Sequence, residues 1–321
     1  MNLQRFGDSI ERGYSIKEME IATEIRKSEE AKGKVDSLKE RIAAYFELTK
    51  PRIAFMLVLT AAVGFYLGSR QLFDWWLFAK AIVAITLLAF GVASLNQFLE
   101  RKTDALMERT AGRPLPSGRL SSVEALIFGI VLCVASEVLF FTSVNALTGF
   151  LGLLVIVGYV LLYTPLKTKT TLSTAIGAIP GAMPPLMGWT SATNQISLEA
   201  WLLFAIILLW QFPHFLAIAW IYRSEYEKAG VLMLPVIDKE GKLTVRQMLI
   251  FAILLFIVSL LPFFIGLAGL IYLFSAFTLG AYFLYCTFLM AKEKSVATAR
   301  KVLVASVIYL PVIFALMVLS F

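Results

Sequence analysis

The chain has 321 residues, of which 59% are hydrophobic and 16% charged, and its mean hydropathy is +0.79. Successive apolar stretches of roughly 18–22 residues are long enough to cross a bilayer as helices. The sequence therefore predicts an all-α, polytopic protein whose main partner is the lipid bilayer. The net charge of +7 would favour nucleic acid in a soluble protein, but in a membrane protein it first reports topology, so no nucleic-acid partner is expected. A single histidine, His214, excludes a histidine-rich metal site.

Residues 1–41 are polar and mixed in charge, and they lack the apolar core of a signal peptide. Their many acidic residues argue against a mitochondrial transit peptide, so we expect a cytosolic tail. The membrane domain is then expected to occupy residues 42–321. Between Val35 and Leu48 a weak amphipathic pattern predicts a helix at the membrane surface. Pro51 suits the start of the first span.

The apolar stretches divide into nine predicted spans. They lie near residues 52–69, 77–98, 122–142, 146–163, 171–189, 199–221, 246–266, 268–290 and 301–320.

The placement of Lys and Arg tests this count. The chain through Arg52 holds 11 of these residues, and the connections after the second, fourth, sixth and eighth spans hold 5, 2, 5 and 4. This puts 27 of the 29 on one side and leaves only Arg70 and Lys80 for the other. By the positive-inside rule, the N-terminus and the even-numbered connections are cytoplasmic, and the C-terminus lies outside.

The fifth predicted span is unusually rich in glycine and proline. Because broken helix at membrane depth is tolerated beside protein or a cavity, this composition is typical of a cavity wall. Close packing of helices at the glycines is the alternative. The residues concerned are Gly177, Pro180, Gly181, Pro184, Pro185 and Gly188.

The connection after the second span carries a row of oxygen-bearing side chains. Asn96, Glu100 and Asp104 are spaced i, i+4, i+8. If the preceding helix continues, each step rotates by about 40° and rises by about 6 Å, so the three project to one side. Such a row suits Mg²⁺, which is often held by one or two carboxylates plus substrate phosphates. A solvated, charged loop is the alternative that spacing alone leaves open.

Two further connections on the same predicted face carry polar clusters. Tyr163 ends the fourth span, and Lys167 and Lys169 follow it as either topology charges or a clamp for diphosphate. The other cluster lies at the end of the sixth span, where His214 and Glu225 are separated by about three helical turns. One continuous helix would put both on the same face, with His214 roughly 16 Å deeper. Because ionisable residues within spans are functional candidates by default, we expect His214 to line a pocket.

Four segments, read together, resemble the UbiA-type membrane prenyltransferases, and within them the members that farnesylate heme. The resemblance covers about residues 45–320. The segments are NQFLERKTDALMERTAGRPLPSGRL, YTPLKTKT, AIPGAMPPLMGW and WQFPHFLAIAWIYRSEYEKAGVLMLP.

The resemblance implies a nine-helix bundle around a central cavity, with a cytoplasmic cap over the catalytic mouth. It implies transfer of a farnesyl group from farnesyl diphosphate to a vinyl group of heme b, assisted by Mg²⁺, in a bacterial cytoplasmic membrane. Asn96, Glu100 and Asp104 match the metal–diphosphate segment. The resemblance also allows association with a heme A synthase. It leaves open other acceptors, such as a quinone precursor or chlorophyllide.

The resemblance also assigns expected roles to residues outside the row. His214 and Glu225 join the catalytic set, with Glu225 either completing a second metal site or anchoring the cap. Four basic residues match positions placed to receive diphosphate oxygens: Arg109, Arg113, Lys167 and Lys169. We expect Arg52, Tyr163 and Tyr222 to complete the substrate-binding set, with Arg52 facing a propionate or the diphosphate. Many family members have aspartate where this chain has Glu100, and the second acidic segment of the family is thin here. A transporter is the competing class, but the sequence shows no repeat, and its charges gather at one face.

Overall fold

The computed structural model describes residues 38–69 and 72–321, and every regular element in these residues is helical. The chain divides into two compact units, residues 1–46 and 47–321. Most of the predicted cytosolic tail lies outside the described residues, as does Arg70. Residues 38–48 are helical, as the amphipathic pattern predicts. The account below concerns the second unit.

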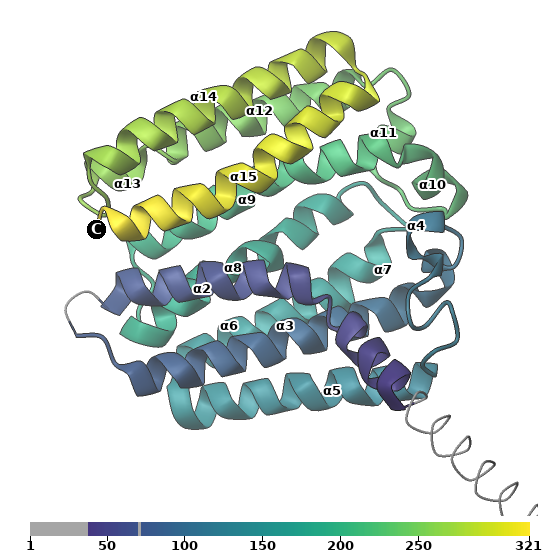
Figure 1. Ribbon diagram of the computed structural model, residues 1–321, viewed down its shortest axis with the longest axis horizontal. Helices are drawn as coiled ribbons and strands as arrows, with labels where there is room; N and C mark the ends of the chain where they lie inside the picture. The colour runs from purple at the N-terminus through teal and green to yellow at the C-terminus, as the bar shows by residue number, and fades with distance from the viewer. Residues whose placement is uncertain (1–37, 70–71) are drawn as a thin grey trace, which may run out of the picture. The chain divides into compact units, whose positions relative to one another are not determined.

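Nine long helical segments form the second unit within the described residues, and they lie where the nine spans were predicted (Figure 1). Three of the segments continue into shorter elements. Segments three and four end in the π-helices η1 (Phe140–Val144) and η2 (Val157–Tyr163), and the seventh is interrupted before α13 (Leu261–Phe264). The long helices are α2 (Pro51–Ser69), α3 (Trp75–Asp104), α5 (Ser122–Leu139), α6 (Ala146–Ile156), α8 (Ser173–Thr193), α9 (Leu198–Ile221), α12 (Lys242–Val258), α14 (Leu270–Glu293) and α15 (Val296–Leu319).

Eight of the nine segments are long and apolar enough to cross a membrane, and α8 is the exception. Its glycine, proline and hydroxyl side chains lower its hydropathy. The residues from Gly177 to Ser191 are nevertheless almost all buried, because α2, α3, α6 and α9 pack around them. Helix α8 therefore lies in the core of the bundle, where the surrounding helices cover it, and it does not need a strongly apolar surface of its own.

The glycines of α8 serve close packing. The helix is continuous despite Pro180, Pro184 and Pro185. A Cβ atom at Gly188 would overlap the carbonyl oxygen of Ala61 in α2. The broken helix that the composition suggested is therefore wrong for α8, and the glycines let two backbones approach.

Polar side chains tie the outer helices to one another inside the apolar interior. The indole Nε1 of Trp210 in α9 donates to the backbone oxygen of Ser306 in α15 at 2.8 Å. The hydroxyl of Tyr272 in α14 donates to the backbone oxygen of Ser259, just after α12, at 2.7 Å. Such bonds satisfy backbone groups where no water is at hand. Figure 1 shows these helices running alongside one another.

The even-numbered connections gather at one end of the bundle, as their shared charge predicts. The backbone N–H of Leu232 donates to the backbone oxygen of Lys167 at 2.7 Å. This bond joins the connection after the sixth segment to the connection after the fourth. A Cβ atom at Gly241 would lie 3.7 Å from the Cδ of Lys294, so the connection after α14 lies there too. These segments include the short helices α4 (Glu108–Ala111), α7 (Thr164–Leu166), α10 (Arg223–Lys228) and α11 (Leu234–Ile237).

Candidate active site

Helix α3 extends six residues beyond the predicted span and ends at Asp104. The helix therefore continues through Asn96, Glu100 and Asp104, as their predicted common face required. We call these three side chains the oxygen row. Asn96 and Asp104 are 1% and 2% exposed. The row is thus a buried feature of the helix end and not a solvated loop.

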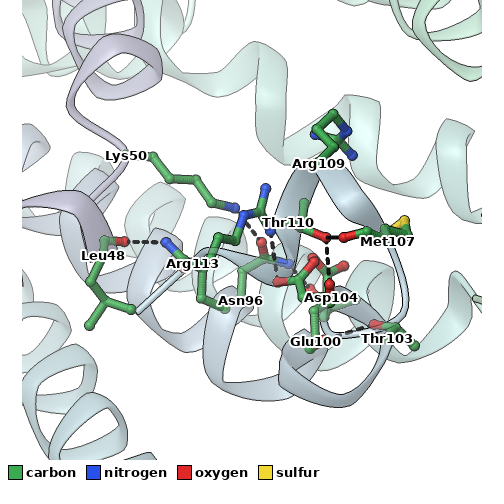
Figure 2. A network of polar contacts seen from close by, with 12 residues as sticks. Leu48, Lys50, Asn96, Glu100, Thr103, Asp104, Met107, Arg109, Thr110 and Arg113 are labelled. Atoms are coloured by element: carbon green, nitrogen blue, oxygen red, sulfur yellow. Dashed lines mark hydrogen bonds and ion pairs between the residues drawn. The ribbon is translucent and has the colours of Figure 1, made fainter. Parts of the chain in front are cut away.

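Asn96 is held by partners from two other segments. The Nζ atom of Lys50 donates to Asn96 Oδ1 at 2.7 Å. Asn96 Nδ2 donates to the hydroxyl of Thr164 at 3.1 Å, and that hydroxyl donates to the backbone oxygen of Tyr159. The amide orientation is therefore fixed, with its oxygen turned toward a cation (Figure 2).

Glu100 forms an ion pair with Lys167, which follows α7. Their atoms Oε1 and Nζ are 2.5 Å apart, and the side chains are 13% and 19% exposed. The Lys167 ammonium also lies 4.4 Å from the centre of the Tyr163 ring, a cation–π distance. Partial burial and the ring together hold the lysine over the carboxylate.

Asp104 is paired with Arg113, which lies after α4. Their atoms Oδ2 and Nη1 are 2.7 Å apart. The chain turns back between them, and the hydroxyl of Thr110 donates to the backbone oxygen of Asp104 at 2.7 Å. Each member of the row therefore has its own cation, and Figure 2 shows the ends of the Lys50 and Arg113 side chains beside the row.

The two lysines of the site differ in their electrostatic environment. Burial, with a smaller contribution from the positive charge of Arg113, lowers the pKa of Lys50 to about 7. Burial is also the largest single influence on Lys167 and opposes its charged form, but the Glu100 carboxylate, together with Tyr163 and Tyr159, raises the pKa of Lys167 well above its usual value. Lys167 is thus held charged by a carboxylate, whereas Lys50 binds a neutral amide oxygen.

A second cluster joins α4 to α10 at the same end of the bundle. The backbone N–H of Arg109 donates to Glu225 Oε2 at 3.2 Å. The Arg109 guanidinium lies 5.3 Å and 5.9 Å from the ring centres of Tyr222 and Tyr226, and its Nη2 donates to the Tyr226 hydroxyl at 3.3 Å. We call Arg109, Tyr222, Glu225 and Tyr226 the cap cluster.

Comparison with known proteins identifies the family. The model of the UbiA prenyltransferase family matches residues 57–315. This chain belongs to the UbiA prenyltransferase family. It is a membrane-embedded, multi-pass prenyltransferase.

Relatives in this family carry a specific name. A protein from Solibacter usitatus named protoheme IX farnesyltransferase is 45% identical over 285 residues, covering 86% of this chain and 98% of its own length. A protein of the same name from Cytophaga hutchinsonii is 36% identical, with coverages of 86% and 96%.

Solved structures of the family share the fold. One, described as digeranylgeranylglyceryl phosphate synthase in membranes, superposes with a TM-score of 0.74 at 20% identity over 88% of this chain and 98% of its own. A UbiA homologue from Archaeoglobus fulgidus, bound to DMAPP and Mg²⁺, gives 0.60 at 16% identity over 85% of this chain and 98% of its own. These likenesses confirm the predicted all-α UbiA-type bundle.

Not all residues expected to act together are adjacent in this UbiA prenyltransferase. Helix α9 ends at Ile221, and Tyr222 (φ −106°, ψ 22°) separates it from α10. The single helix that would place His214 and Glu225 on one face is therefore wrong. The His214 ring stacks on Trp210 with centroids 4.5 Å apart, and its Nδ1 lies 2.7 Å from the Ser306 hydroxyl of α15.

Two of the expected cationic residues lie outside the row and the cap cluster. Arg52 and Lys169 are exposed. Among the described residues, neither makes a hydrogen bond or an ion pair through its side chain, in contrast to Lys167 and Arg113, which are paired with the row.

Three neighbours of the site were absent from the sequence-based set. Lys50 appeared there only as one of the topology charges before Pro51, and Thr164 and Tyr226 lie inside segments quoted for other residues. The contact between Lys50 and Asn96 joins positions 46 residues apart, which no local pattern predicts. Tyr226 is the one of the three with a local signal, since it lies one residue from Glu225.

The oxygen row supplies only part of the ligand set that Mg²⁺ requires. Within residues 38–69 and 72–321, no group of three or more His, Cys, Asp or Glu side chains is placed to hold a metal ion. The row offers two carboxylates and one amide, which are hard oxygen donors of the kind Mg²⁺ takes together with substrate phosphates. The residues thus fit a metal that arrives with a diphosphate, and they are too few for an all-protein cage.

The expected central cavity remains a prediction. A pocket of about 550 Å³ is instead formed between α3, α5, η1 and α6, and its surface is apolar. None of the oxygen row or the cap cluster lines it.

Proposed function

We propose that this chain transfers a farnesyl group from farnesyl diphosphate to a vinyl group of heme b and so makes heme O. The observation that carries the proposal is the 36–45% identity, over most of the chain, to relatives named protoheme IX farnesyltransferase. The paired row at the end of α3 supports it, because this row supplies groups suited to a diphosphate leaving group.

The chain's own cations perform the first task. Breaking the allylic C–O bond leaves negative charge on the diphosphate, and Lys167 and Arg113 are placed to receive its oxygens through charge-assisted hydrogen bonds. Lys50 is a third donor at the same place. When bound, Mg²⁺ supplies Lewis-acid stabilisation of that charge, and Asn96, Glu100 and Asp104 are the residues that would hold it.

The cap cluster is proposed to cover the diphosphate. The segments that carry Arg109 and Tyr222 also share a buried apolar cluster that includes Met107 and Ala229. The contacts of Arg109 itself are exposed, so its side chain can rearrange over a substrate and help exclude water from it. Glu225 accepts a hydrogen bond from the Arg109 backbone, which favours the role of cap anchor over a second metal site.

The hydrogen bonds of His214 restrict what its ring can do. The Ser306 hydroxyl donates its single proton to the backbone oxygen of Leu303 at 2.6 Å, so it accepts from His214 Nδ1. The neutral ring then carries its proton on Nδ1 and a lone pair on Nε2. This tautomer favours an iron ligand or a proton acceptor and disfavours a neutral donor to a propionate.

A proton acceptor is needed in the proposed reaction. The farnesyl C1 bonds to the terminal vinyl carbon as its bond to diphosphate breaks. A water oxygen then bonds to the vinyl carbon next to the porphyrin, and that water loses one proton. The product is a hydroxyethylfarnesyl heme, and Nε2 of His214 is the proposed acceptor of the proton.

The setting of the enzyme is also a proposal beyond its multi-pass membrane character. The gathering of Lys and Arg at the end that carries the row supports a cytoplasmic active site in a bacterial inner membrane. Residues 1–41 are proposed as a cytosolic tail outside the membrane domain of residues 42–321. Association with a heme A synthase stays a prediction.

Incubation of the purified protein with heme b, farnesyl diphosphate and Mg²⁺ tests the proposal, with product mass as the readout. We expect the mass gain of one farnesyl group and one hydroxyl group. Parallel reactions offer 4-hydroxybenzoate and chlorophyllide as acceptors. Farnesylation of either of these, with heme b unchanged, would overturn the assignment of the acceptor while leaving the prenyltransferase class intact.

A further inference from the structure

We propose that a divalent cation and a diphosphate must bind to the oxygen row together. Without them, Lys50, Lys167 and Arg113 occupy the row. When both ligands bind, these three cations exchange the row for the diphosphate as their partner. This inference rests on the proposed function. It concerns the coupling between the two ligands, which the assignment of the reaction does not determine.

Every side chain of the row is paired with a cation. Each of its three side chains meets a different cation at 2.5–2.7 Å, and these cations come from three separate segments of the chain. One oxygen atom of each row side chain is occupied in this way, so a free divalent cation would have to displace these cations or bind close beside them. In the described structure every side chain of the row is therefore already engaged by a cation of the chain.

Charge balance opposes a metal without its anion. The two carboxylates of the row face three cationic side chains, a formal sum of +1 when Lys50 is charged. A divalent ion alone would raise this to +3 among side chains of which Asn96 and Asp104 are almost fully buried. A prenyl diphosphate carrying about three negative charges would return the sum close to zero. Buried sites penalise unbalanced charge heavily, because low dielectric screens it poorly.

The number of protein ligands gives an independent reason. The described residues offer no set of three or more acidic, histidine or cysteine side chains that could hold a metal. Mg²⁺ demands six ligands and normally takes several from water and substrate phosphate. Diphosphate oxygens can supply the missing ligands and, at the same time, accept the hydrogen bonds that the three cations now give to the row.

Lys50 is the most specific part of this arrangement. Its backbone adopts φ +51°, a region that favours glycine, yet the residue there carries a side chain that reaches the row. Lys294 adopts nearly the same conformation, φ +50°, at the end of α14. The two positions share their backbone geometry, but only Lys50 contacts the row, which makes Lys294 a matched control.

The experiment measures binding of Mn²⁺ as the metal probe, by the spin-resonance signal of free Mn²⁺, to the full chain in lipid nanodiscs. Titrations are made with and without farnesyl thiodiphosphate, a slowly reacting analogue. Mn²⁺ taken up by the analogue is measured in protein-free nanodiscs and subtracted. The variants are Lys50→Met, Lys50→Gly, which suits the backbone conformation, and Lys294→Met.

We expect the analogue to raise the Mn²⁺ affinity of the wild type by about tenfold or more, within the usual range for coupled sites. Both Lys50 variants should bind Mn²⁺ alone more tightly than the wild type and show a smaller effect of the analogue. Lys294→Met should match the wild type. A purely structural role for Lys50 would weaken Mn²⁺ binding instead.

Two results would overturn the coupling. One is equal Mn²⁺ affinity with and without the analogue in a wild type that binds both. The other is no gain in Mn²⁺ affinity in either Lys50 variant. A wild type that retains neither Mn²⁺ nor the analogue under any condition would instead overturn the proposed function, so the two failures are distinct.

Discussion

The oxygen row and the cap cluster lie at the same end of the bundle, yet they are built differently. The row is part of a long helix, and its side chains are paired by short contacts at buried positions. The cap cluster joins two short helices through a hydrogen bond from the Arg109 backbone, a hydrogen bond from its guanidinium to Tyr226, and ring contacts of the same exposed arginine. Buried pairs are strongly disturbed by loss of one partner, whereas exposed contacts contribute little.

This difference separates two requirements of the reaction. Stabilising a leaving group needs charges fixed in advance, and in the proposed function the helix end with its three cations would provide them. Admitting and releasing substrate needs side chains that rearrange at little free-energy cost, and the exposed contacts of Arg109 in the cap cluster suit that role. Substitutions in the row should therefore reduce the chemical step strongly, and substitutions in the cap cluster should have smaller effects.

The largest effect is expected for Asp104→Ala. This change removes a buried carboxylate of the row and leaves Arg113 without its partner. Farnesyl transfer should fall by about 100-fold or more, in the range seen when one electrostatic stabiliser is removed. The rate of product formation in membranes with matched protein levels is the measurement.

Glu108→Ala is the control for Asp104→Ala, because Glu108 is an exposed acid four residues further along the chain. It should retain nearly full activity. Near-normal heme O formation by Asp104→Ala, with the protein inserted in the membrane, would contradict the assignment of the row to diphosphate and metal.

A smaller but clear effect is expected for Lys167→Met. Lys167 is paired with Glu100 and lies over the Tyr163 ring, whereas Lys169 is exposed. Loss of one charge-assisted contact should lower kcat/KM for farnesyl diphosphate by about 10- to 100-fold. Lys169→Met should change it by less than about threefold, because exposed charges contribute little.

The pair Lys167→Met and Lys169→Met tests the resemblance as well as the structure. The resemblance gave both lysines the same role, and the structure distinguishes them. Equal losses in the two variants would show that Lys169 reaches the substrate on binding, and the contrast between paired and exposed lysines would then carry no functional meaning.

Much of the fold was predictable because it depends on local composition. Hydropathy and the placement of Lys and Arg predicted nine segments and one charged end. The spacing of Asn96, Glu100 and Asp104 predicted their common face, since helical geometry is periodic and α3 continues through them. The glycine and proline content of α8 was ambiguous, because close packing and a cavity wall require similar residues.

The remaining features depend on contacts that no local pattern encodes. The approach of Lys50 to Asn96 is set by how α2 and α3 pack. The end of α9 at Ile221 has no glycine or proline to announce it, and a helical extrapolation therefore carried His214 and Glu225 onto one face. The Ser306 partner of His214 comes from a helix near the other end of the sequence.

The smallest effect is expected in the cap cluster, where Glu225→Gln keeps an oxygen for the Arg109 backbone N–H but removes the charge. Exposed hydrogen bonds of this kind contribute modestly, so kcat should change by only about two- to fivefold. Glu227→Gln on the same short helix is the matched control. Glu227 pairs with Lys239 at an exposed site away from Arg109, and its loss should leave kcat unchanged. If Glu225→Gln were instead as inactive as Asp104→Ala, the cap would hold part of the fixed charge array, and the division between a rigid row and a loose cover would be wrong.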